Sequence, residues 1–133
     1  MTEIGAIHTG SCLCGGVRYR VRGGLRGVIA CHCSQCRRTS GHFAAMTSAP
    51  SANIELTNSD RLVWYKSSDT AERGFCSGCG GNLFWKLAGR DDISITAGTL
   101  DTPTGLEIEE HIFFADKSDY YNIDDDLPKK AQW

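Results

Sequence analysis

Seven cysteines carry the most informative pattern in this chain, because they fall into three short clusters. The clusters are Cys12/Cys14, Cys31/Cys33/Cys36 and Cys76/Cys79. An odd number of cysteines would leave one thiol unpaired if they formed only disulfides. Thiolates at these spacings are typical zinc ligands, so the sequence predicts that the chain binds two zinc ions.

A closed metal site is predicted for two of the clusters. Cys76 and Cys79 form a C-x-x-C knuckle followed by Gly80, and glycine accepts the backbone angles that let both thiolates face one ion. Cys12 and Cys14, which glycines also follow, can supply the other pair of ligands. Four thiolates around one zinc leave no position for a solvent ligand, so this site would be structural.

The third cluster predicts different chemistry. Cys31, Cys33 and Cys36 can hold one face of a metal tetrahedron, and three protein ligands with an open position are the pattern of catalytic zinc. Zinc with three thiolates is formally anionic, so it suits an incoming thiol better than hydroxide. We therefore predict that this site adds a thiol to an electrophilic carbon or cleaves the resulting C–S bond. With three ligands, this zinc is expected to be the more easily lost.

Spacing alone leaves two alternatives open. Cys31 and Cys33 could pair with Cys76 and Cys79, which would divide the ligands differently. The middle cluster could also serve a redox or metal-buffering role, because exposed thiolates that are not fully ligated are prone to oxidation.

The composition predicts an ordinary globular protein. The 133 residues fit a single domain over 1–133, and 41% hydrophobic with 23% charged residues argue against disorder. The net charge of −2 argues against a general nucleic-acid-binding protein, which would carry a basic surplus.

Two features of the sequence favour a cytoplasmic protein that is not embedded in a membrane. No apolar run approaches the ~20 residues that span a bilayer, and residues 1–10 lack the basic start and apolar core of a signal peptide. A reducing compartment disfavours structural disulfides, which supports metal binding by the cysteines.

Short segments of alternating hydrophobicity predict a mostly-β domain. Strands are expected around 17–21, 62–65, 83–85, 93–97 and 112–114, separated by breaks rich in Gly, Ser, Asn and Asp. No segment shows a helical stripe over three turns, and short helical turns are expected only at 37–41 and 104–107. A fold with so many connections has few long-range apolar anchors, so metal cross-links would stabilise it.

Residues beside the middle cluster are candidates for substrate contact. Arg37 and Arg38 could bind a substrate carboxylate, or they could only offset the anionic metal centre. His42 is a candidate acid or base because histidine exchanges protons near neutral pH, and a structural histidine is the alternative. His32 lies between two predicted ligands, so its side chain is expected to point away from the metal.

Several residues further along the chain receive a structural interpretation. Core positions are expected for six aromatic residues, some of which could instead line a pocket: Trp64, Tyr65, Phe84, Trp85, Phe113 and Phe114. His111 is expected to be a strand-end residue, and residues 124–126 (three aspartates) are expected to form a solvated turn. Tyr120 or Tyr121 could cap the site.

The order of these motifs resembles one protein family. The chain reads GSCLCGGVRY at 10–19, CHCSQCRR at 31–38 with Gly41 after it, FCSGCG at 75–80 and HIFFADK at 111–117, running on to Asp126-Leu127-Pro128. Together these segments are similar to the glutathione-dependent formaldehyde-activating enzyme family, and the resemblance covers nearly the whole chain.

The resemblance implies a fold, two metal sites and an activity. The fold would be a small zinc-bound domain of packed, bent antiparallel sheets of the β-tent type. The structural zinc would be held by Cys12, Cys14, Cys76 and Cys79, and the catalytic zinc by Cys31, Cys33 and Cys36. The activity would be carbon–sulfur bond formation or lysis, in which glutathione and formaldehyde give S-hydroxymethylglutathione. The implied partner is a small-molecule thiol such as glutathione.

A rival hypothesis is a non-catalytic zinc-ribbon-like module that binds a protein or nucleic acid. Arg18, Arg20 and Arg22 would share one face of a strand and form a basic patch together with Arg26. The near-neutral net charge counts against nucleic acid as the partner. The sequence leaves the oligomeric state open.

Overall fold

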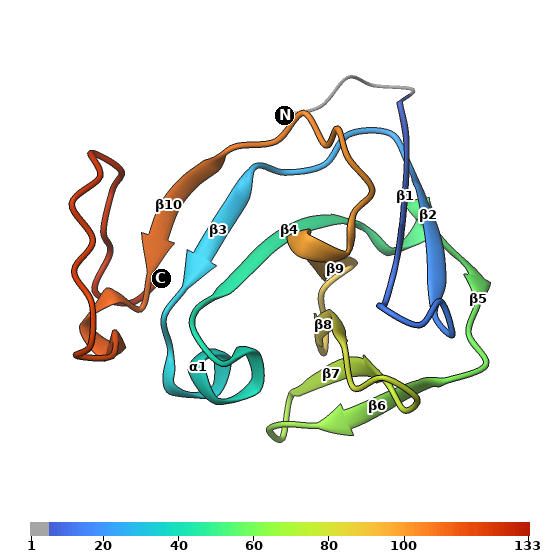
Figure 1. Cartoon of the computed structure of the whole chain (residues 1–133), viewed down its shortest axis with the longest axis horizontal. Helices are drawn as coiled ribbons and strands as arrows, with labels where there is room; N and C mark the ends of the chain where they lie inside the picture. Colours follow the sequence, from blue (N-terminus) through green and yellow to red (C-terminus); the bar gives the residue numbers. More distant parts are fainter. Residues whose placement is uncertain (1–5) are drawn as a thin grey trace.

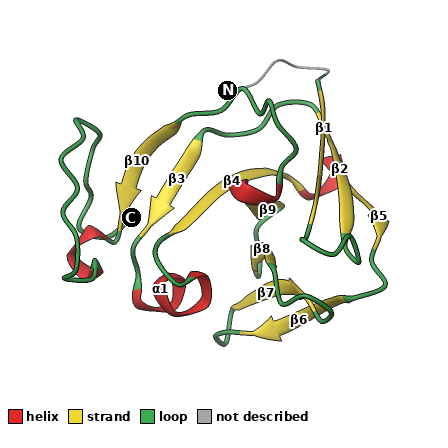
Figure 2. Cartoon of the chain, viewed as in Figure 1, coloured by secondary structure: helices red, strands yellow, loops and turns green. Residues whose placement is uncertain are grey.

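A computed structural model describes residues 6–133. The strands in this range are β1 (Ile7–Ser11), β2 (Arg18–Arg22), β3 (Val28–Cys31), β4 (Ala44–Pro50), β5 (Ile54–Asn58), β6 (Leu62–Lys66), β7 (Ala71–Cys76), β8 (Asn82–Leu87), β9 (Asp92–Thr96) and β10 (Ile108–Ile112). The helical elements are α1 (Ser34–Ser40) and the 3₁₀-helices η1 (Ser51–Asn53), η2 (Ala97–Thr99) and η3 (Phe114–Asp116). The mostly-β fold with short helical turns is confirmed (Figure 1, Figure 2).

The strands form a small and a large sheet. The small sheet has the order β1-β2-β5, and the large one the order β10-β3-β4-β9-β8-β7-β6. Neighbouring strands are antiparallel except β10 and β3, which run parallel. The long strand β4 leads through η1 into β5, so the chain passes from the large sheet to the small one (Figure 1).

The hydrophobic core includes residues of both sheets. Its buried members include Val17, Tyr19, Val21, Leu25, Leu83, Phe84, Ile95 and Leu100. Alternation in β2 explains the contribution of the small sheet, because Tyr19 and Val21 are buried while Arg18 and Arg22 on the other face are exposed.

The large sheet uses its two faces differently. Phe84 of β8 pairs with Ile95 of β9, and both belong to the core. The next pair, Trp85 and Ser94, points to the opposite face because side chains alternate along a strand, and both line a cleft there. Sequence patterning predicted these strands, but it did not predict that one sheet face would border an open cleft.

The helical turn predicted at 37–41 is part of α1, which begins earlier, at Ser34. Cys33 is its N-cap, and Gly41 ends it with φ of 80°, a left-handed conformation that glycine adopts without steric cost.

The helical turn predicted at 104–107 is wrong. The chain is irregular there, with Gly105 in the left-handed region at φ of 70°. The carbonyl of Glu107 accepts a hydrogen bond from Val28 N at 2.8 Å, at the start of β3. Pairing with a distant strand therefore replaces the local helical bond.

The strand predicted at 112–114 is also wrong beyond its first residue. Strand β10 ends at Ile112, and Phe113 turns the chain with φ of 50° into η3. The C-terminal segment, residues 117–133, returns beside β10, where His111 N donates to Pro128 O at 2.9 Å and Phe113 N donates to Gln132 O at 2.8 Å. Long-range pairing decides the end of this strand.

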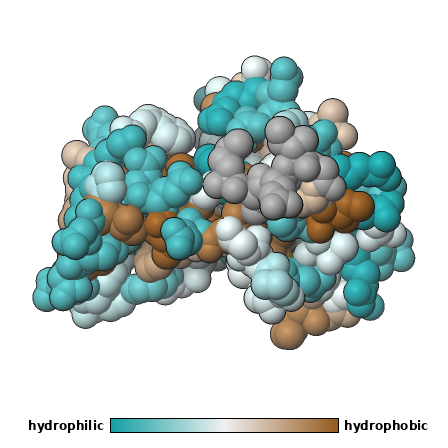
Figure 3. All heavy atoms as spheres, turned by 90° about the horizontal axis from the view of Figure 1, so that it is seen from above, coloured by the Kyte–Doolittle hydropathy of each residue, from teal (hydrophilic) through white to brown (hydrophobic). Residues whose placement is uncertain are grey.

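Most of the surface seen in Figure 3 is hydrophilic, with hydrophobic residues showing mainly in a band across its middle. Within residues 6–133 no helix has the length and apolar character needed to cross a membrane.

Candidate functional site

The first cysteine group, named here the four-cysteine group, consists of Cys12, Cys14, Cys76 and Cys79, whose sulfur atoms all lie within 4.8 Å of one another. Cys14 Sγ is 3.7 Å from Cys12 Sγ and 3.5 Å from Cys76 Sγ. A tetrahedral zinc with Zn–S bonds of about 2.3 Å requires sulfurs about 3.8 Å apart. The four sulfurs therefore fit one zinc ion.

The four-cysteine group is surrounded by backbone N–H donors. Val17 N lies 3.4 Å from Cys12 Sγ, and Gly78 N lies 3.3 Å from Cys76 Sγ. Such N–H groups stabilise thiolates and orient them toward an ion. Arg61 Nη1 lies 3.8 Å from Cys14 Sγ and adds a positive charge beside this sulfur. The group joins the β1–β2 turn to the β7–β8 turn.

The second group, named here the three-cysteine group, consists of Cys31, Cys33 and Cys36, whose sulfurs also lie within 4.8 Å of one another. Cys31 ends β3, Cys33 is the N-cap of α1, and Cys36 lies in the first turn. The Cys33 sulfur accepts a hydrogen bond from Cys36 N at 3.3 Å. The strand end and the helical turn together direct three thiols to one point.

The thiols of the three-cysteine group influence each other's ionisation strongly. Hydrogen bonds from Cys31 and Cys36, with a smaller contribution from the Arg73 charge, lower the pKa of Cys33 to about 2. The hydrogen bonds of Cys31 with Cys33 and Cys36, together with burial, raise the pKa of Cys31. Without a cation, only part of the group can ionise, so a bound metal ion is what would let all three become thiolates.

All three cysteines of this group line a cleft of about 500 Å³. This volume is typical of sites that bind small molecules. The floor of the cleft is the face of the large sheet opposite the core, and the residues that line it there include Ile29, Met46, Trp85 and Ser94. Within residues 6–133, none of the cysteines of the four-cysteine group lines it.

The cleft is predominantly basic. Among the described residues, its lining includes Arg26, Arg73, Arg90 and Lys130, but only one acidic side chain, Glu110. Arg90 is engaged with Asp92 and Lys130 with Glu110, at N–O distances of 2.9 and 2.8 Å. Arg73 Nη2 lies 3.7 Å from Cys36 Sγ, and its Nε is buried without a hydrogen-bond partner in the described residues. The cleft is thus suited to an anionic ligand.

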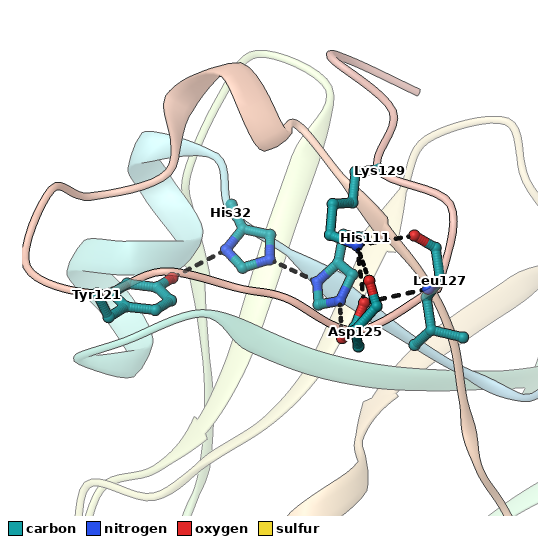
Figure 4. Close-up of polar contacts among 6 residues, drawn as sticks. All are labelled: His32, His111, Tyr121, Asp125, Leu127 and Lys129. Carbon is teal, nitrogen blue, oxygen red and sulfur yellow. Dashed lines mark hydrogen bonds and ion pairs between the residues drawn. The ribbon is translucent and has the colours of Figure 1, made fainter.

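A network of polar side chains begins at the segment that carries the three-cysteine group, residues 31–36, named here the ligand loop (Figure 4). His32, between two cysteines of the three-cysteine group, is fully buried, and its Nε2 lies 2.9 Å from His111 Nδ1. His32 Nδ1 lies 3.1 Å from the Tyr121 hydroxyl, and His111 Nε2 lies 2.8 Å from Asp125 Oδ2. The network ties the ligand loop to β10 and to the C-terminal segment.

One acceptor in this network is fixed by its chemistry. Hydrogen bonds from Lys129 and His111 lower the pKa of Asp125 to about 2, so its ionised carboxylate accepts from His111 Nε2–H. Burial lowers the pKa of His32 to about 4, so its ring is neutral at pH 7. The direction of the His32–His111 and His32–Tyr121 hydrogen bonds depends on the tautomer of each ring.

This network corrects two sequence interpretations. His111 is buried within β10 and hydrogen-bonded on both ring nitrogens, and is not a simple strand-end residue. Asp125 is not only part of a solvated turn, because its carboxylate contacts His111 and Lys129. The expectation that His32 points away from the metal ligands agrees with its contacts.

The structure does not bring the predicted substrate residues to the cleft. Among the described residues, Arg37, Arg38 and His42 are all absent from its lining. His42 Nδ1 forms a hydrogen bond with Tyr120 OH, and its ring packs against Tyr121. Neither tyrosine is among the described residues that line the cleft.

The predicted aromatic core is only partly correct. Phe84 is buried and Trp64 packs against the core. Tyr65 is exposed, whereas Trp85 and Phe113 line the cleft. These residues have the same hydrophobic character in the sequence. Alternation places neighbours such as Phe84 and Trp85 on opposite faces, and the tertiary structure decides which face meets the core.

Sequence reasoning missed the cleft cations Arg73, Arg90 and Lys130 and gave Arg26 a different role. They come from separate segments, so no local motif identifies them as a group. Arg26 was grouped with the arginines of β2, but in the structure it lines the cleft, and Arg20 instead forms an ion pair with Glu55.

Residues 7–116 match the family described as glutathione-dependent formaldehyde-activating enzyme. The chain belongs to this family. The match includes all seven cysteines, and it confirms the resemblance seen in the cysteine motifs.

Two other proteins are similar to this family member. An uncharacterized lyase of Schizosaccharomyces pombe is 26% identical over 118 residues, which cover 87% of this chain and 85% of that protein. A crystal structure of a Rhodobacter sphaeroides protein matches with a TM-score of 0.60 and 25% identity, over 73% of this chain and 91% of that one. The similarity to that structure supports the observed fold.

Proposed function

We propose that this protein is a zinc-dependent carbon–sulfur lyase that joins a thiol and an aldehyde, or separates them, with glutathione and formaldehyde as the reacting pair. The observation that carries the proposal is the three-cysteine group at the edge of a basic cleft. The family description names glutathione and formaldehyde, and the S. pombe relative is named a lyase, which supports the same reaction class.

The reaction balances without an oxidant or reductant. The thiol sulfur attacks the aldehyde carbon, a C–S bond forms, and the C=O double bond becomes a C–O single bond. The thiol proton is transferred to the new hydroxyl oxygen. In the reverse direction the C–S bond breaks and the hydroxyl proton returns to sulfur.

The donor sets suit two zinc ions, one structural in the four-cysteine group and one catalytic in the three-cysteine group. When bound by Cys31, Cys33 and Cys36, zinc would supply an open position for the substrate sulfur and favour its thiolate form.

The protein side chains around this position have complementary roles in the proposal. Arg73, with Nη2 3.7 Å from Cys36 Sγ, provides positive charge where the sulfur and the developing alkoxide are negative. Ile29, Met46 and Trp85 form an apolar wall that excludes water from the reacting atoms. His42 does not line the cleft, so this proposal does not include it in proton transfer.

The alternative of a non-catalytic binding module is less well supported. Its basic patch is divided, since Arg26 lines the cleft and Arg20 is paired with Glu55. We also propose a cytoplasmic location, because all seven cysteines are free and thiolate sites persist in a reducing compartment.

Zinc content and zinc–sulfur coordination, measured with and without glutathione, test the metal part of the proposal. We expect two zinc ions per chain and an average sulfur coordination that rises from about 3.5 to four when glutathione is added. Two ions with unchanged coordination would reject binding of the substrate sulfur at this site.

The reaction itself is tested by NMR exchange between formaldehyde and S-hydroxymethylglutathione, because the two also interconvert without a catalyst. The protein should accelerate the exchange, and the Cys33→Ser variant should leave it at the uncatalysed rate. Equal acceleration by the variant would contradict the proposed site.

A further inference from the structure

Arg26 is a half-buried cation at the cleft whose charge has no ionic partner in the described structure. Its Nε donates to Gly27 O at 3.2 Å and its Nη2 donates to Met46 O at 3.0 Å. Both acceptors are neutral carbonyls, and no carboxylate within residues 6–133 forms an ion pair with it. The carboxylates of Asp92, Glu109 and Glu110 act on its charge only from beyond ion-pair distance, so the guanidinium can still take a ligand anion in direct contact, which would stabilise this half-buried cation.

The other cleft cations already have partners or lie elsewhere. Arg90 donates through both Nε and Nη2 to the Asp92 carboxylate, at 3.0 and 2.9 Å. Lys130 is paired with Glu110, and Arg73 lies against the sulfur of Cys36. Arg26 is therefore the cleft cation best suited to a ligand group at a distance from the sulfurs.

Two anchored nitrogens hold the Arg26 guanidinium in place and leave Nη1 without a hydrogen bond in the described structure. Burial lowers the pKa of this guanidinium, while the carboxylates of Asp92, Glu109 and Glu110 oppose that shift. The group stays charged, because arginine is protonated throughout the physiological range. It offers a fixed donor to an incoming carboxylate.

The strand register gives the spacing along the backbone between the residue that Arg26 contacts and the three-cysteine group. Cys31 pairs with Ala44, and Ile29 pairs with Met46, the residue whose carbonyl Arg26 contacts. Two residues along an antiparallel strand correspond to about 7 Å. In a cysteinylglycine unit the sulfur and the glycine carboxylate are about 7 Å apart when extended. In free cysteine the carboxylate is much closer to the sulfur.

We propose that Arg26 binds a carboxylate located one peptide unit from the substrate thiol, so that the cleft selects thiols containing a cysteinylglycine unit. This inference rests on the proposed function, because it requires the thiol to bind at the three-cysteine group. It assigns the specificity for the glycine end of a glutathione-like thiol to one residue.

Isothermal titration of the zinc-loaded full chain tests the assignment. The ligands are glutathione, glutathione esterified at its glycine carboxylate, and γ-glutamylcysteine, which lacks the glycine. The wild type should bind the last two about 10- to 100-fold more weakly than glutathione, the range of a lost charge-assisted hydrogen bond. Arg26→Gln should bind all three with similar, weak affinity, and Arg26→Lys should fall between.

Matched variants separate the possible outcomes. Arg22→Gln removes an exposed arginine away from the cleft and should behave as wild type. A wild type that binds the ester as tightly as glutathione would overturn the inference but not the proposed function. The difference in affinity between glutathione and its glycine ester could disappear in Arg90→Gln or in Lys130→Gln but persist in Arg26→Gln. That result would assign the carboxylate contact to Arg90 or to Lys130 instead. Absence of any glutathione binding to the zinc-loaded wild type would reject both proposals.

Discussion

The four-cysteine group joins two hairpin turns, whereas the three-cysteine group ends a strand beside a cleft. Each has one arginine close to a sulfur: Arg61 Nη1 lies 3.8 Å from Cys14 Sγ, and Arg73 Nη2 lies 3.7 Å from Cys36 Sγ. The ligands and the charge beside them are thus alike. The two groups differ in ligand number and in access to the cleft.

This comparison shows that two similar cysteine groups can have very different surroundings in one fold. Four thiols complete a tetrahedron and connect segments 62 residues apart, so their metal would contribute mainly to folding. Three thiols leave a position open, and the neighbouring cleft can hold a ligand there. The following variants test how far stability and activity divide between the two groups.

The largest effect is expected from Cys76→Ser in the four-cysteine group. A structural zinc contributes about 10 kcal/mol or more to folding, which is comparable to the whole stability of a domain. We expect loss of one zinc together with unfolding near room temperature, measured by circular dichroism and elemental analysis. A variant that keeps a wild-type melting temperature would show that this group does not hold the fold together.

Cys33→Ser in the three-cysteine group should produce the opposite pattern. We expect one zinc to be lost and the exchange reaction to fall to the uncatalysed rate. The melting temperature should fall by only a few degrees, since the segments here are also joined by the His32–His111 network. Unfolding of this variant, comparable to that of Cys76→Ser, would contradict the division of roles.

Arg73→Gln and Arg61→Gln form a matched pair that compares the charges beside the two groups. Loss of a group that supports a metal site typically costs about 10- to 100-fold in activity or metal affinity. We expect Arg73→Gln to lower kcat/KM within this range, with little change in melting temperature. Arg61→Gln should leave kcat/KM near the wild-type value. Equal losses of activity would mean that the two charges act in the same way.

The smallest effect is expected from His111→Phe. It leaves His32 Nε2 buried without a partner, which costs about 1–3 kcal/mol of folding free energy. We expect a lower melting temperature and faster removal of the catalytic zinc by a chelator, because the ligand loop loses a support. Asp126→Asn, in an exposed position nearby, is the control. An unchanged chelation rate would show that the network supports only the C-terminal segment.

The motifs that could be predicted from the sequence are local ones. The ligands of each cysteine cluster lie within a few residues of each other, so spacing alone shows that Cys76 and Cys79 can face one ion. The alternation in β2 and β9 likewise predicts strands. The predicted elements at 104–107 and 112–114 failed because hydrogen bonds to distant segments, at Val28 and Gln132, decide the backbone there.

The sequence by itself determined the clustering of the cysteines that could hold metal, the family and the mostly-β class, because each depends on short spacing or on period-two patterning. Only the tertiary structure decided which charged residues meet the open site. Arg26, Arg73 and Lys130 come from three separate segments, while Arg37, next to Cys36 in the chain, is not among the residues that line the cleft. Side chains of neighbouring residues can point to different sides of the chain. The packing of β7, the segment before β3 and the C-terminal segment brings the distant side chains to one cleft.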